Sequence, residues 1–77
     1  MKAVQTREEK KMKVLVNGQE KTLTQTEKLK DFIEQFCNDH RYVIAEVNGE
    51  IIKNRHWDQT TLKNGDIIEL VNFVGGG

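Results

Sequence analysis

The chain of 77 residues has no proline, one cysteine and no excess of either charge. A single cysteine, Cys37, excludes an internal disulfide and a zinc site built from several cysteines. Twelve basic residues balance twelve acidic ones, which argues against nucleic-acid binding, because broad electrostatic binding needs an excess of lysine and arginine on one face. The chain has neither a signal peptide nor an apolar run approaching roughly twenty residues. We therefore expect a cytoplasmic protein that does not enter a membrane.

Asn-Gly pairs supply the turns that proline does not. They stand at Asn17-Gly18, Asn48-Gly49 and Asn64-Gly65, each beside a strand-like segment. No GxGxxG, P-loop or GxSxG motif is present, so these glycines are better explained by turns than by phosphate binding.

The first eleven residues, MKAVQTREEKK, carry six charged groups and no hydrophobic periodicity. We expect residues 1–11 to form a polar extension outside the core, either disordered or a short frayed helix. Met12 begins a clear pattern and could itself be an original start residue. A native leader and an added one therefore both stay open.

Residues 12–40 predict a β-hairpin followed by a helix. Hydrophobic side chains alternate from Met12 to Val16, and Leu23 lies in the returning strand. The period then changes to a helical stripe, and Thr24 or Thr26 is suited to cap its start. Glu27 would lie near the positive end of the helix dipole, and residues 38–40 would end the helix. The stripe consists of Leu29, Phe32, Ile33, Phe36 and Cys37.

Residues 41–74 predict two more strands, a crossing and a last strand. Val43, Ala45 and Val47 share the expected core face of the first of these strands, and Glu46 lies on the other. A short returning strand follows the second Asn-Gly pair. An irregular connecting segment comes next, with one helical turn around Trp57, and it leads to a strand over residues 67–74.

This order predicts an α+β fold, with a mixed four- to five-stranded sheet and one main helix packed on one face. The first and last strands lie side by side and parallel at the centre of the sheet. Such an arrangement is the β-grasp, or ubiquitin-like, fold. It would span residues 12–74 and be followed by a flexible glycine tail, residues 75–77.

Candidate catalytic and metal-binding residues are few. Cys37 could be a nucleophile or a persulfide carrier, but a cysteine on a helical stripe is usually a small buried hydrophobe. His40 and His56 have no partner at a metal-ligand spacing such as HExxH or CxxC, so we expect surface or capping histidines and no metal site. We expect no self-contained active site and therefore no enzyme.

The last strand, DIIELVNFV, carries hydrophobic side chains on the face that Glu69 assigns to solvent. Val71 and Phe73 share that face, and Leu15 of the neighbouring strand should lie on the same side. Such a cluster suggests a protein-docking surface. The alternative is a set of scattered apolar side chains of the kind that any domain exposes.

The terminal glycines can enter a narrow channel of a partner, because they have no side chains. Three extended residues reach roughly 10 Å. They would deliver the terminal carboxylate to chemistry in the partner. A free carboxylate must first be activated, most simply as an acyl-adenylate made with ATP by that partner, since this chain has no nucleotide motif and is expected to bind no cofactor.

These features together resemble the ThiS family of sulfur carriers of thiamin thiazole biosynthesis, which is related to MoaD and to ubiquitin. The resemblance rests on the strand and helix order, the NGE and NGD turns and the terminal FVGGG. It implies that Gly77 is adenylated by a ThiF-like enzyme and converted to a thiocarboxylate, which donates sulfur to a ThiG-like thiazole synthase. The sulfur would come from a source such as a cysteine desulfurase. Gly75 and Gly76 would extend the tail, and Phe73 and Val74 match the family's hydrophobic segment before it.

Two alternatives stay open. A MoaD-type carrier for molybdopterin synthesis would use the same tail chemistry with a different acceptor. A ubiquitin-like modifier or interaction domain would involve no sulfur chemistry. In each case we expect a monomer when the chain is free.

Overall fold

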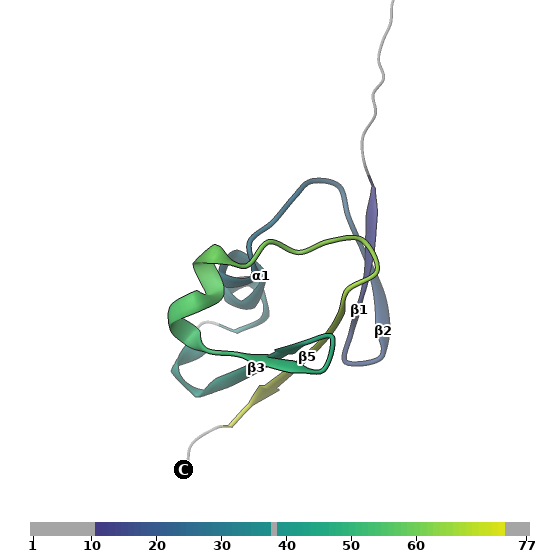
Figure 1. Cartoon of the computed structure of the whole chain (residues 1–77). Coiled ribbons are helices and arrows are strands. Elements are labelled where there is room, and N and C mark those ends of the chain that lie inside the picture. The colour runs from purple at the N-terminus through teal and green to yellow at the C-terminus, as the bar shows by residue number, and fades with distance from the viewer. Residues whose placement is uncertain (1–10, 38, 74–77) are drawn as a thin grey trace, which may run out of the picture.

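The computed structural model of the chain describes residues 11–37 and 39–73. These residues form five strands, one α-helix and two 3₁₀ helices (Figure 1). The predictions for residues 1–10, Asn38 and residues 74–77 lie outside the described residues. In chain order the elements are β1 (Met12–Val16), β2 (Gln19–Leu23), α1 (Leu29–Phe36), η2 (His40–Tyr42), β3 (Val43–Val47), β4 (Glu50–Ile52), η3 (Asn54–Gln59) and β5 (Ile67–Asn72).

The strands form one mixed sheet in the order β2-β1-β5-β3-β4. β1 and β5 are parallel neighbours, whereas the other pairs are antiparallel. The sheet is strongly twisted and curved, and α1 lies on its concave side (Figure 1). The predicted fold, with its last strand at the centre, is confirmed.

The first two Asn-Gly pairs form the predicted hairpin turns with both residues in left-handed backbone conformation. The φ angles are 50° and 83° at Asn17 and Gly18, and 53° and 86° at Asn48 and Gly49. Turns of this hand match the right-handed twist of the strands that they join. A Cβ at either glycine would meet no atom within 4 Å, so the backbone angle, and not a lack of space, favours glycine there.

The helix is shorter than predicted, and the proposed threonine caps are wrong. α1 begins at Leu29 after Lys28, which makes no side-chain cap. Before it, the backbone pairs with a later loop: the Leu29 amide donates to the Thr60 carbonyl at 2.7 Å, and the Leu62 amide donates to the Glu27 carbonyl at 2.9 Å. These long-range bonds hold the segment before the helix extended, so Glu27 lies outside the helix.

The C-terminal end of the stripe also differs from the prediction. α1 ends at Phe36, which is 43% exposed, and Cys37 follows in extended conformation with φ −154°. The Cys37 amide still closes the last turn by donating to the Ile33 carbonyl. Only the first three residues of the stripe are therefore buried, and Cys37 is a half-buried residue packed against the edge of the core.

The core lies between the sheet and α1 and is closed at one end by Trp57. The Trp57 indole is 2% exposed and donates its Nε1–H to the Ile52 carbonyl at 2.9 Å, which satisfies the one polar group of a buried indole. The helical turn predicted around it is η3. The buried hydrophobic residues are Val14, Leu23, Leu29, Phe32, Ile33, Val43, Ala45, Trp57, Leu62, Ile68 and Leu70.

Candidate functional site: the outer sheet face and the end of β5

The side of the sheet that faces away from α1 carries exposed hydrophobic side chains; we call it the outer face. Ile68 and Leu70 of β5 point to the core, so the alternate residues of this strand lie on the outer face. The side chains of Leu15, Val71 and Phe73 are 38%, 48% and 50% exposed. Their predicted exposure is therefore confirmed.

Further aliphatic residues on this face come from β3, β4 and β5 itself. Ile44 of β3 is directly opposite Val71, and Leu15 of β1 is paired with Ile67. Ile51 of β4 also lies on this face. Ile44 and Ile51 were not among the predicted docking residues, although alternation with the buried Val43 and Ala45 places Ile44 on this face.

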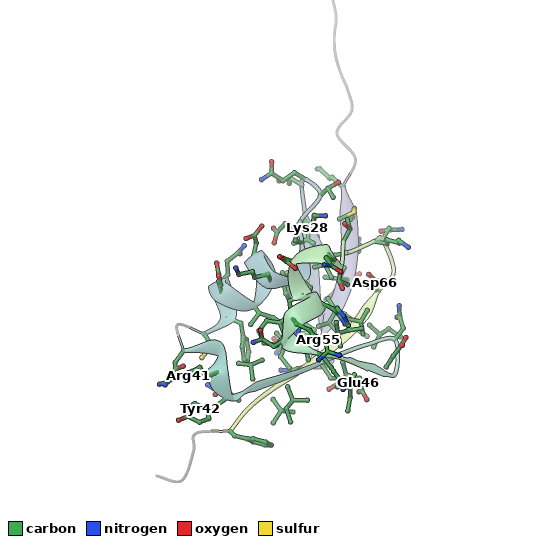
Figure 2. All side chains as sticks on the ribbon, turned by 60° about the vertical axis from the view of Figure 1, so that its left-hand side comes forward. Lys28, Arg41, Tyr42, Glu46, Arg55 and Asp66 are labelled. Carbon is green, nitrogen blue, oxygen red and sulfur yellow. The ribbon has the colours of Figure 1, made fainter. Side chains whose placement is uncertain are left out.

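The described part of the chain ends beside η2. The Phe73 amide donates to the Tyr42 carbonyl at 2.8 Å, one residue beyond the last residue of β5. Arg41 and Tyr42 lie at the same end of the molecule (Figure 2). The Arg41 guanidinium donates to both oxygens of Asp39 at 2.9 Å and lies 5.4 Å from the centre of the Tyr42 ring. These hydrogen bonds and the charge of Asp39 raise the pKa of Arg41.

Two turn asparagines hold β5 in its central position. The Asn17 side chain accepts from the Leu70 amide at 2.8 Å and donates to the Leu70 carbonyl at 3.2 Å. It thereby continues the β1–β5 pairing beyond the end of β1. The Asn48 side chain accepts from the Ile67 amide and donates to the Asp66 carboxylate, both at 2.9 Å. The sequence motif predicted the turns but not these contacts.

Cys37 contacts the last residue of β5. Its Sγ atom accepts a hydrogen bond from the Asn72 side-chain amide at 3.2 Å and donates to the Asp39 carbonyl at 3.4 Å. The thiol therefore joins the loop after α1 to the end of the strand. Both contacts support a structural role.

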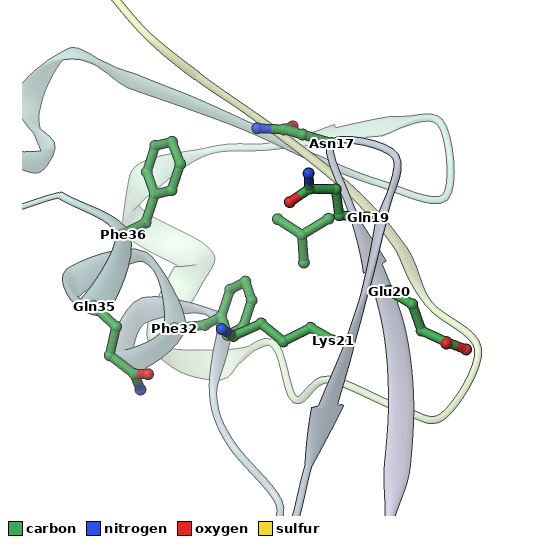
Figure 3. A pocket seen from close by; sticks show the side chains of 8 residues that line it. Asn17, Gln19, Glu20, Lys21, Phe32, Gln35 and Phe36 are labelled. Carbon is green, nitrogen blue, oxygen red and sulfur yellow. The ribbon is translucent and has the colours of Figure 1, made fainter.

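A groove of about 470 Å³ lies on the other side of the sheet, between α1 and the β1–β2 hairpin. Phe32 and Phe36 of α1 face Gln19 and Lys21 of β2 across it, whereas Glu20 points away (Figure 3). Its walls carry amide and ammonium groups but no nucleophile beside a base.

The described residues hold no group of three or more His, Cys, Asp or Glu side chains that could bind a metal ion. Within the same segments, no helix has the length and apolar character needed to cross a membrane. His56 is exposed. The predicted tail residues Val74, Gly75, Gly76 and Gly77 lie outside the described part of the chain.

The mixed sheet, with parallel first and last strands at its centre and one helix across it, defines a protein of the β-grasp class. Within that class, the chain belongs to the ThiS family, whose family model matches residues 14–77.

Similar proteins include a solved structure. The crystal structure of the thiamine biosynthesis protein ThiS from Geobacter metallireducens has a TM-score of 0.72 and 32% sequence identity, and the match covers 86% of this chain and 100% of that chain. The sulfur carrier protein ThiS of Bacillus subtilis is 35% identical over 63 residues, which cover 80% of this chain and 96% of that protein.

A third similar protein is much longer. A thiazole synthase of Paramagnetospirillum magneticum is 32% identical over 66 residues, which are 86% of this chain but only 20% of the synthase. The present chain therefore corresponds to about a fifth of that protein.

Proposed function

We propose that this chain is a sulfur carrier of thiamine biosynthesis, and that it acts as a co-substrate and not as an enzyme. The observation that carries the proposal is the match to the ThiS family, which extends through the last glycine, Gly77. The similarity to the Bacillus subtilis sulfur carrier supports the same role. In this role Gly77 supplies the reacting carboxylate, and Gly75 and Gly76 let it reach into a partner.

The carboxylate is charged with sulfur in two steps. A carboxylate oxygen of Gly77 attacks the α-phosphorus of ATP in a ThiF-like adenylating enzyme, and pyrophosphate leaves. Sulfide then attacks the acyl carbon; where a cysteine desulfurase is the source, a thiol reductant first releases sulfide from the desulfurase persulfide and is itself oxidised to a disulfide. The C–O bond to AMP breaks, and the carboxylate becomes a thiocarboxylate. Activation is needed because the free carboxylate is resonance-stabilised and a poor acyl donor.

The sulfur acceptor in this proposal is a ThiG-like thiazole synthase. It is supported by the Paramagnetospirillum magneticum thiazole synthase, which contains a segment similar to this chain. A carrier-like segment and a synthase in one polypeptide would be held at a high effective concentration of each other. Two separate chains must instead recognise each other through a surface.

We assign docking of the partners to the outer face. Leu15, Val71 and Phe73 are exposed there, and Phe73 directly precedes Val74 and the tail. A partner that covers these side chains would gain the free energy of apolar burial. It would also hold the start of the tail close to its own active site.

The acceptor can be tested by unloading the charged carrier. The chain is first charged with a ThiF-like enzyme, ATP and sulfide, then repurified and divided between two reactions. One reaction contains a ThiG-like thiazole synthase together with its small-molecule substrates, and the other contains the large subunit of a molybdopterin synthase. We expect the intact mass to return to that of the carboxylate only with the thiazole synthase and its substrates. Unloading in the reaction with the molybdopterin synthase subunit, and not in the reaction with the thiazole synthase, would contradict the proposal and favour a MoaD-type carrier.

A further inference from the structure

Two carboxylates lie side by side in the middle of the outer face. Glu46 of β3 is directly opposite Glu69 of β5, and Glu46 is labelled in Figure 2. Residues opposite each other in this way have Cβ atoms about 4.5–5.5 Å apart. Four neighbouring positions on the same face carry exposed aliphatic side chains: Ile44, Ile51, Ile67 and Val71.

Neither carboxylate is compensated within the described chain. Among residues 11–37 and 39–73, the side chains of Glu46 and Glu69 form no hydrogen bond or ion pair, and the ion pairs that occur there join other residues. Like charges directly opposite each other destabilise a sheet. The pair therefore lowers the stability of the free domain, and no hydrogen bond or ion pair of the two carboxylates within the described residues offsets this repulsion.

The surroundings of the pair restrict what covers it. A face that contacts only water has no need for four exposed aliphatic side chains around its centre. A purely apolar partner would bury two unpaired carboxylates, which is costly. A cation surrounded by an apolar surface satisfies both the carboxylates and the aliphatic side chains.

We propose that the outer face docks an apolar surface of the adenylating enzyme that carries a basic side chain at its centre, between Glu46 and Glu69. This inference rests on the proposed function. Arginine fits the position best, because its planar guanidinium carries five donors and can serve two carboxylates at once. Since the net charge of the chain is zero, this local pair, and not a global field, selects the cationic partner.

The test compares two double variants of equal charge change. Glu46→Gln with Glu69→Gln removes the pair and keeps the shape of both side chains. Glu50→Gln with Asp58→Asn removes two exposed carboxylates elsewhere, one on the opposite face of β4 and one on η3. Affinity for a purified ThiF-like adenylating enzyme is measured by calorimetry at ionic strengths of about 0.05 M and 0.5 M.

We expect the first double variant to bind about thirtyfold more weakly than the wild type or worse, because the enzyme's cation would be buried unpaired. Its affinity should also depend less on salt. The control variant should bind within about threefold of the wild type, as expected for carboxylates outside the interface. Circular dichroism would verify that all proteins are folded.

The proposal is overturned if the two double variants bind equally well, or if removal of the pair tightens binding. Failure of the wild-type chain to bind the adenylating enzyme would overturn it as well. The proposed function is read separately, from the intact mass after charging at saturating enzyme. A wild-type chain that gains sulfur while both double variants bind alike would retain the proposed function and lose only this inference.

Discussion

At the scale of single residues, Asn17 makes long-range hydrogen bonds that its turn motif does not predict. Its position before Gly18 predicts a hairpin, and its φ of 50° fits that prediction. Its side chain also makes two hydrogen bonds to Leu70, 53 residues further along the chain. Asn17 therefore closes the first hairpin and fixes the central strand that leads to the tail.

Replacing Asn17 should cost much of the stability of this small domain. Asn17→Ala removes two hydrogen bonds and places alanine, which tolerates left-handed backbone less well than asparagine, at a φ of 50°, for a loss of about 2–3 kcal/mol in the free energy of unfolding. Asn64→Ala is the matched control, because Asn64 has no positive φ and its side chain accepts one bond, from the Lys13 amide. It should cost about 1 kcal/mol. Equal losses in urea unfolding would contradict the role of Asn17.

At the scale of elements, β5 combines two functions in six residues. Its inner side chains Ile68 and Leu70 are buried in the core, while its outer side chains remain half-exposed. Successive side chains of a strand point to opposite faces of the sheet, so both the inner and the outer set could be predicted from the sequence. Its central place beside β1 followed from the expected crossover, whereas its pairing with β3 was not predicted.

The helix was predicted less well, for a physical reason. Hydrophobic periodicity located Leu29, Phe32 and Ile33 on the buried face. Periodicity cannot reveal that the loop at residues 60–62 pairs with the backbone before Leu29, which is a tertiary hydrogen-bond pattern. Nor does a local pattern show that Phe36 is exposed and lines the groove.

Phe36 and Phe73 allow a direct test of which face of the domain docks the adenylating enzyme. Both rings are about half-exposed, on opposite sides of the sheet. Phe73→Glu should weaken binding at least about tenfold, because a charge replaces an apolar contact in the interface. Phe36→Glu should change the affinity little, and neither exposed substitution should alter the free energy of unfolding by more than about 1 kcal/mol. Calorimetry would decide: equal effects of the two variants would refute docking on the outer face.

At the scale of the whole molecule, the proposed function requires the domain to present a reactive terminus to its partners. The described residues provide an exposed apolar sheet face and a central strand that leads towards the tail, and they hold no group of three or more His, Cys, Asp or Glu side chains that could bind a metal ion. The fold could be predicted because the strand and helix order, the turns and the alternation all agree. The Glu46–Glu69 pair and the η2 contact at the end of β5 could not, since they depend on strand register and on the path of the loop after α1.

The central claim is that Gly77 becomes a thiocarboxylate, and the intact mass of the charged chain tests it most directly. The chain is incubated with a ThiF-like enzyme, ATP and sulfide, beside a variant that lacks Gly77 and a Cys37→Ala variant. We expect the wild type and Cys37→Ala to gain the mass of one oxygen-to-sulfur exchange, and the truncated variant to gain none. No mass change in the wild type with an enzyme that charges its own carrier, or sulfur that is lost with Cys37, would contradict the account.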